Sequence, residues 1–134
     1  MPETPRAYVL DSFAFLAYFQ AEPGGAYVRD LIRAANSRTA SLHVSMINVG
    51  EMYYIVSRRR SAQRAEALIS DLRHLPITFC AATEERILSA ARIKAEHPIS
   101  YADAFAASLA QELQASLVTG DPEFEAVKQI IAVL

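Results

Sequence analysis

Cysteine and tryptophan are scarce in this chain, whose 134 residues include one cysteine, Cys80, and no tryptophan. A single cysteine excludes an internal disulfide framework and a zinc site built from cysteines. Cys80 ends the apolar segment "ITFC". We expect it to be a small buried hydrophobic residue rather than a reactive thiol.

Long hydrophobic runs are also missing. Asp, Glu or Gln interrupts the longest apolar segments, so none reaches the length that spans a membrane. The N-terminal sequence "MPETPRAYVLDS" lacks the basic start and apolar core of a signal peptide. We therefore expect a cytoplasmic protein that has no membrane partner.

No excess of positive charge indicates nucleic-acid binding, since 13 Lys and Arg residues face 15 Asp and Glu residues. If the partner is a polyanion, local basic patches or metal ions must attract it. The apolar fraction is 52% and the charged fraction 21%, which is typical of a compact globular protein. The length is that of one ordinary domain, and we find no linker or repeat, so we expect a single domain over residues 1–134.

Short apolar segments alternate with segments of helical pattern along the whole chain. Ser45 and Thr83 have the residue type and position of helix N-caps. The predicted strands are 7–11, 39–45, 77–80, 116–121 and 129–134. The predicted helices are 12–19, 25–36, 46–60, 61–75, 83–97 and one that follows Pro98. This alternation predicts an α/β fold, with a parallel sheet of about five strands flanked by helices on both faces.

Four acidic residues are expected near one edge of this sheet. Asp11 ends the first predicted strand, and Asp121 follows the fourth strand after one glycine. Ligands of open parallel sheets bind beyond the carboxyl ends of the strands. Glu51 lies one helical turn after Asn48, and Asp103 lies in the first turn of its helix, a position commonly near the same rim. We expect the four carboxylates to converge there.

Each acid taken alone also has a structural explanation. Asp103 follows Ser100 by three residues, as in a capping box. Asp11 is a common type of helix cap, and Asp121 precedes a proline, as turn residues often do. Glu51 has arginines such as Arg58 or Arg59 on neighbouring turns with which it can pair. For any single acid, the sequence does not decide between the structural explanation and a place in a shared site.

The four acids together indicate a metal site. Carboxylates held close together repel and raise one another's pKa unless a cation lies between them. Mg²⁺ or Mn²⁺ takes oxygen ligands and also binds substrate phosphates. Zinc is disfavoured, because the three histidines are scattered and show no ligand spacing.

Four segments, in this order, resemble the acidic motifs of PIN-domain ribonucleases: "YVLDSFAFLAYF", "SMINVGEMYY", "SYADAFAASLA" and "LVTGDPEF". Specifically, the chain resembles the VapC-type toxins of prokaryotic toxin–antitoxin modules over nearly its whole length. None of the acidic positions departs from the family pattern.

The resemblance implies a metal-dependent endoribonuclease that hydrolyses RNA phosphodiester bonds with a metal-activated water, as the toxin of a type II system. Its members are usually homodimers and are held inactive by a cognate VapB-type antitoxin. Carried over by position, Asp11 and Asp103 would be the principal Mg²⁺ or Mn²⁺ ligands. Glu51 would complete the triad, and Asp121 would be the fourth acid. The small polar residues of the same motifs, which would orient the acids or a water, are Ser12, Asn48 and Thr119.

The segment "SRRRSAQR" is the candidate RNA-binding patch, with Arg58, Arg59, Arg60 and Arg64 at one helix end and the start of the next. The alternative is that these cations complement a helix dipole and remain solvated. The aromatic side chains of the first helix, Phe13, Phe15, Tyr18 and Phe19, are core residues or line a groove for an antitoxin helix.

Two other functions remain open. One is a PIN-type nuclease of RNA processing that has no antitoxin, and the other is an inactive RNA- or protein-binding module with the same fold. The presence of all four acids disfavours the second. A phosphatase of the haloacid dehalogenase type is set aside, since it needs an Asp two residues after the first one, where this chain has Phe13.

Overall fold

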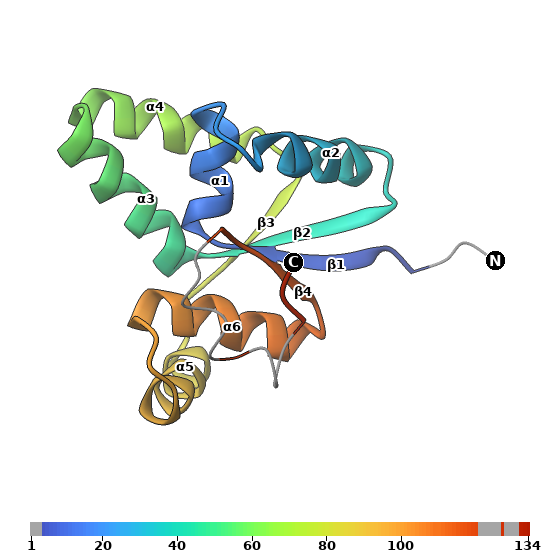
Figure 1. Ribbon diagram of the computed structural model, residues 1–134, viewed down its shortest axis with the longest axis vertical. Helices are drawn as coiled ribbons and strands as arrows, with labels where there is room; N and C mark the ends of the chain where they lie inside the picture. Colours follow the sequence, from blue (N-terminus) through green and yellow to red (C-terminus); the bar gives the residue numbers. More distant parts are fainter. Residues whose placement is uncertain (1–3, 121–126, 128–131) are drawn as a thin grey trace.

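A central parallel sheet lies between two layers of helices in the computed structural model, which describes residues 4–120, 127 and 132–134 (Figure 1). The strands are β1 (Arg6–Leu10), β2 (Ala40–Ser45), β3 (Ile77–Cys80) and β4 (Ser116–Val118). The helices are α1 (Ser12–Phe19), α2 (Gly25–Asn36), α3 (Met46–Arg59), α4 (Ala62–Arg73), α5 (Glu84–Glu96) and α6 (Tyr101–Leu113). The predicted fold class is confirmed.

The strand order is β3-β2-β1-β4, and all three strand pairs are parallel. The described sheet therefore has one strand fewer than the five predicted. Most of the predicted strand at 129–134 lies outside the described residues. Its described end runs beside β4, where Val133 forms an isolated parallel bridge with Leu117.

The side chains of the central strands alternate between two cores. Leu10 of β1 and Leu42 of β2 pack with α1, α2, α3 and α4 on one face of the sheet. Val9 of β1 and Leu117 of β4 pack with α5 and α6 on the other face. Figure 1 shows the same division, with α5 and α6 on the opposite side of the sheet from α1 and α2. Both faces of the sheet are therefore covered by helices, as is usual for parallel sheets.

Side-chain caps explain where the helices begin. The Ser45 hydroxyl accepts a hydrogen bond from the Ile47 amide at the start of α3, and Thr83 accepts one from the Arg86 amide at the start of α5. Both predicted N-caps are confirmed. In the part of the chain that the structure describes, no helix has the length and apolarity needed to cross a bilayer.

Candidate active site

Asp11 lies where β1 ends and α1 begins, and its side chain is 1% exposed. Its Oδ1 atom accepts a hydrogen bond from the Ala14 amide at 2.9 Å, which caps α1. Its Oδ2 atom accepts a hydrogen bond from the hydroxyl of Thr119, just after β4. The structural explanation of Asp11 as a cap is thus confirmed, and the second oxygen ties the carboxylate to the neighbouring strand.

Glu51 is held by Ser12, the residue that follows Asp11 in the chain. Ser12 is fully buried, and its hydroxyl donates a hydrogen bond to Glu51 Oε1 while lying 3.1 Å from the backbone oxygen of Asn48. Within the described residues Glu51 makes no salt bridge. The alternative that Glu51 merely pairs with Arg58 or Arg59 is therefore wrong.

Asn48 connects α3 to the helix that carries Asp103. Its side chain is fully buried, and its Nδ2 atom donates to the backbone oxygen of Ala102 at 3.3 Å. Its Oδ1 atom is buried and, among the residues described, accepts no hydrogen bond. A buried acceptor without a donor is unfavourable, so this atom is available to a donor or a cation beside the first turn of α6.

Asp103 is 2% exposed in the first turn of α6. The Ser100 hydroxyl accepts a hydrogen bond from the Asp103 amide at 3.1 Å, so this half of the capping box is present. The face below it consists of small side chains that are all buried, namely Ala106, Ala107 and Ala110. They let α6 pack closely against the sheet, which fixes the direction of the carboxylate.

Asp121 lies outside the described residues, so the proposed convergence of four carboxylates stays a prediction. Residues 4–120 and the described positions beyond them hold no cluster of three His, Cys, Asp or Glu side chains poised for a metal ion. The structure does join the motifs of α1, α3 and β4 through Ser12 and Thr119, and the amide of Asn48 links α3 to α6.

The donor atoms at this edge are carboxylate, amide and hydroxyl oxygens. These are the ligands that Mg²⁺ and Mn²⁺ prefer, whereas zinc prefers thiolate and imidazole. The free Oδ1 atom of Asn48 adds an uncharged oxygen to the set. The residues present therefore fit a hard divalent cation.

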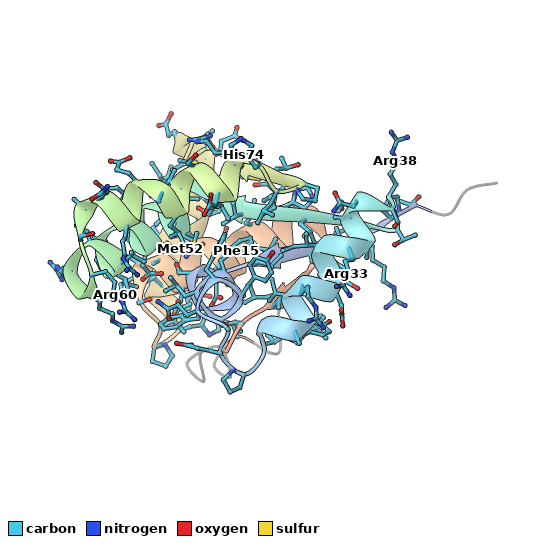
Figure 2. The ribbon with its side chains drawn as sticks, turned by 90° about the horizontal axis from the view of Figure 1, so that it is seen from above. Phe15, Arg33, Arg38, Met52, Arg60 and His74 are labelled. Carbon is cyan, nitrogen blue, oxygen red and sulfur yellow. The ribbon has the colours of Figure 1, made fainter. Side chains whose placement is uncertain are left out.

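The four arginines of the candidate RNA-binding patch are exposed at the end of α3 and the start of α4. Arg58 lies over the ring of Tyr54, 5.3 Å from its centroid. Arg60 and Arg64 line a groove of about 470 Å³ between α1, α3 and α4. In Figure 2, Arg60 points outward at one end of the molecule, whereas Arg33 and Arg38 point outward at the other.

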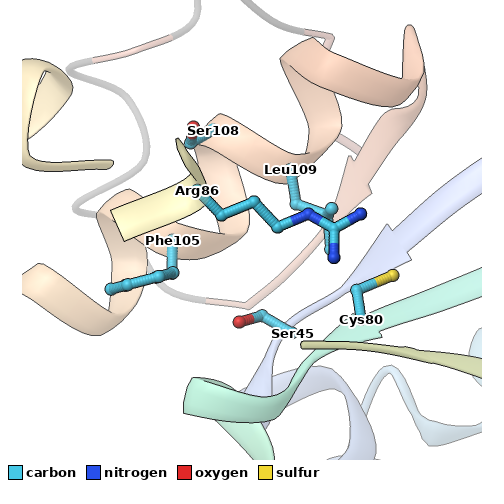
Figure 3. Close-up of a pocket in the computed structure, with 6 residues that line it drawn as sticks. All are labelled: Ser45, Cys80, Arg86, Phe105, Ser108 and Leu109. Carbon is cyan, nitrogen blue, oxygen red and sulfur yellow. The ribbon is translucent and has the colours of Figure 1, made fainter. Parts of the chain in front are cut away.

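Cys80 has the environment that the sequence predicts. It is buried at the end of β3, and burial raises the pKa of its thiol. Figure 3 shows the thiol in a small space that is also lined by Ser45, Arg86 and residues of α6. Arg86 donates two hydrogen bonds to the Glu112 carboxylate, which the sequence did not reveal because the two residues are distant along the chain.

Phe13 is a residue of α1 for which the sequence leaves two environments open, the core or a groove for an antitoxin helix. Its side chain is 42% exposed next to Asp11 and Ser12, so the core reading is wrong and the groove reading stays a prediction. Its neighbour Phe15 is fully buried (Figure 2). The helical period distinguishes them: α1 turns Phe15 toward the core and Phe13 toward the carboxyl edge of the sheet.

Residues 8–130 match the family described as PIN domain. No curated protein sequence matches the chain. Among solved structures, VapBC from Salmonella typhimurium bound to DNA has a TM-score of 0.75 at 18% identity, covering 96% of this chain and 97% of that one. VapBC2 from Rickettsia felis, bound to a promoter fragment, has a TM-score of 0.73 at 19% identity, with the same coverages. VapC20 from Mycobacterium tuberculosis, described as a Sarcin-Ricin loop cleaving toxin, has a TM-score of 0.70 at 17% identity, covering 90% and 94%.

Proposed function

This chain belongs to the PIN-domain family, and from that membership we propose that it is a metal-dependent endoribonuclease, the VapC-type toxin of a type II toxin–antitoxin system. One observation carries the proposal. Asp11 is a buried carboxylate at the carboxyl edge of the sheet, held from two sides by the α1 amide and Thr119. Its neighbour Ser12 holds Glu51. Support also comes from the likeness to toxin structures, one of which is described as a Sarcin-Ricin loop cleaving toxin.

The proposed ligands of Mg²⁺ or Mn²⁺ are Asp11 and Asp103, completed by Glu51 and by Asp121. A bound cation of this kind would polarise the scissile phosphodiester, lower the pKa of the attacking water and stabilise the leaving oxygen. The nearly complete burial of Asp11 and Asp103 keeps both carboxylates out of bulk solvent. Electrostatic interactions are stronger in such surroundings than in water.

The neighbouring polar residues fix the positions of these acids. The Ala14 amide and Thr119 donate to the two oxygens of Asp11, and Ser12 donates to one oxygen of Glu51. Asn48 connects α3 to the backbone of Ala102, immediately before Asp103. Preorganisation of this kind lowers the cost of assembling the site when the substrate binds.

The proposed partners are RNA, a VapB-type antitoxin and a second copy of the chain, with RNA cleavage taking place in the cytoplasm. The VapBC complexes that resemble the chain support the antitoxin. Exposed apolar side chains on α5 and α6 supply surface for a homodimer: Ile87, Leu88 and Tyr101. Light scattering should then give twice the mass of one chain. A nuclease of RNA processing would instead have no antitoxin gene next to its own.

The proposal is tested with Asp11→Asn, because asparagine caps helices about as well as aspartate but removes the charge. We expect Asp11→Asn to unfold at nearly the parent temperature and to have lost RNA cleavage in Mg²⁺ or Mn²⁺. The matched control is Asp30→Asn, an exposed acid on α2, which should cleave RNA like the parent. Cleavage by Asp11→Asn at the parent rate, or no effect of EDTA on the parent, would refute the proposed site.

A further inference from the structure

A cavity of about 270 Å³ opens beside the candidate active site, between α1, α2 and the end of β4. Two exposed aromatic side chains flank it: Phe13 of α1, 42% exposed, and Tyr27 of α2, 45% exposed. Its lining also includes Ala14 and Thr119, the two residues that donate hydrogen bonds to Asp11. The cavity and the Asp11 carboxylate therefore share a wall.

We propose that this cavity binds one unstacked nucleobase of the RNA substrate, between Phe13 and Tyr27, next to the phosphodiester that is cut. The inference rests on the proposed function for the identity of the substrate. It adds the substrate class, which is single-stranded RNA with a splayed base, and it names two residues that determine cleavage preference.

The chemistry of the lining selects a base rather than a phosphate. Among the described residues that line the cavity, no side chain is charged, so a phosphate would find no cation there. Nucleobases are flat, largely apolar on their faces and polar at their edges. Sequence-specific RNA recognition commonly stacks such bases on aromatic side chains and reads their edges with hydrogen bonds. Here the lining includes Tyr27, whose hydroxyl can donate or accept, together with Thr119 and Gly120.

The size and position of the cavity agree with this ligand. Its volume falls just below the roughly 300–1,000 Å³ of pockets that hold drug-sized molecules, so one base fits and a helix of a protein partner does not. Burial raises the pKa of Tyr27, so its phenol remains protonated and can donate a hydrogen bond at neutral pH. The close approach of α1 and α2 also fixes the cavity wall, since a Cβ atom on Gly25 would lie 2.6 Å from the Ala17 backbone oxygen.

The first test does not depend on cleavage. The protein, labelled in its aromatic side chains, is titrated by NMR with the four ribonucleoside 5′-monophosphates and separately with ribose 5-phosphate. We expect the Phe13 and Tyr27 ring signals to shift with the nucleotides, to different extents for different bases, and not with ribose 5-phosphate. Signals that do not respond to any nucleotide, or that respond equally to ribose 5-phosphate, would overturn the inference.

The second test maps the cuts in a pool of single-stranded RNAs of random sequence. Phe13→Ala should lower kcat/KM at the preferred sites by about 5- to 150-fold, the range expected from losing one base–aromatic stack. It should also flatten the base preference beside the cut, whereas Phe13→Tyr should retain it. The control is Thr39→Ala, an exposed residue between α2 and β2, which should cut like the parent.

The two proposals fail in different ways. A parent protein that cuts no RNA contradicts the proposed function, whatever the NMR titration shows. The Phe13→Ala variant could also keep the parent's base preference and bind a candidate antitoxin more weakly. That result would assign the cavity to a protein partner and overturn the inference about the base.

Discussion

Asp11 occupies a position for which the sequence presents two roles as alternatives. Its position after a strand and before a helix suits both a cap and a metal ligand. The structure assigns one oxygen to the cap and the other to Thr119, and both hydrogen bonds hold the carboxylate in one orientation. A cap residue that faces the carboxyl edge of a parallel sheet is also well placed to bind a cation, so the two readings do not compete.

Thr119→Val tests the hydrogen bond that orients Asp11. The valine keeps the shape of the side chain but removes the donor, leaving a buried carboxylate oxygen without this partner. We expect a decrease of about 1–3 kcal/mol in the free energy of unfolding, and cleavage about 10- to 100-fold slower. Chemical denaturation and initial cleavage rates measure the two effects.

The control is Thr39→Val, because Thr39 is exposed and its hydroxyl donates to the Ala34 backbone oxygen near the end of α2. It should change cleavage little. Equal cleavage by Thr119→Val and Thr39→Val would show that orientation of Asp11 by Thr119 is unimportant for catalysis.

His43 on β2 should make stability depend on pH. Burial lowers its pKa below the ordinary value of 6.5, so the unfolded chain binds a proton more readily than the folded one. This contribution to stability is fully present above pH 6.5 and is lost as the pH falls through the lower folded pKa. Urea unfolding from pH 7.5 downward should show His43→Gln losing less stability than the parent. Parallel curves for the two proteins would exclude His43 as the source.

The hydrogen bonds that build the site could not be read from local pattern. Ser12 and Glu51 are 39 positions apart, and Asp11 and Thr119 are 108 apart. Helix and strand periodicity reports only neighbours within a few residues. The order of the motifs, and the rule that ligands bind beyond the carboxyl ends of parallel strands, predicted that these residues lie at one edge of the sheet. The hydrogen-bond partner of each oxygen could be identified only from the structure.

At the scale of elements, the sequence predicted most of the helices and strands because their ends carry specific chemistry. Ser45, Thr83 and Ser100 each accept a hydrogen bond from a first-turn amide, and such caps are visible as residue types. The strand at 129–134 was predicted from an apolar run alone. Most of it lies outside the described residues, and its described end makes one bridge, between Val133 and Leu117.

The packing of α1 against α2 depends on a glycine. A Cβ atom at Gly25 would lie 2.6 Å from the oxygen and 3.1 Å from the carbon of the Ala17 carbonyl, and backbone atoms cannot move aside cheaply. We expect Gly25→Ala to lower the free energy of unfolding by about 1–3 kcal/mol, as overpacking does. Thermal and urea denaturation would measure the change.

Gly50 provides the matched substitution. It lies on an exposed part of α3, and a Cβ atom there would meet nothing within 4 Å. Gly50→Ala should therefore stabilise the protein by about 0.5–1 kcal/mol, because alanine loses less backbone entropy in a helix. If Gly25→Ala and Gly50→Ala change the free energy of unfolding in the same direction, the close approach of α2 to α1 does not explain the glycine at position 25.

At the scale of the whole molecule, α3 carries an acid near one end and arginines at the other. Glu51 lies in the second turn of α3 and Arg60 caps its other end, about 14 Å away along the axis at 1.5 Å per residue. Several nucleotides of single-stranded RNA cover such a distance. The overall composition is nearly neutral and does not reveal this separation of charge. The separation is recognised only from the position of α3 in the fold.

Reversing the charge of Arg59 and Arg60 should weaken RNA binding and reduce its dependence on salt. For single strands, the slope of log K against log salt concentration should fall by about 0.7 for each phosphate that the variant no longer neutralises. The control reverses Arg33 and Arg38, which lie at the opposite end of the molecule (Figure 2). Fluorescence anisotropy with a labelled RNA measures both. Equal slopes for the two double variants would show that Arg59 and Arg60 are solvated and do not contact RNA phosphates.

The most direct measurement is the initial rate of RNA cleavage by the parent and by Asp103→Asn as Mn²⁺ is titrated. Asparagine keeps the size of the buried side chain in α6 and removes its charge. We predict that the parent rate rises with Mn²⁺ and falls to background in EDTA. The Asp103→Asn rate should stay at least about 100-fold lower, because losing a ligand of a catalytic cation removes several kcal/mol of transition-state stabilisation. Equal rates for the two proteins across the titration would contradict the assignment of Asp103 to a metal-dependent nuclease site.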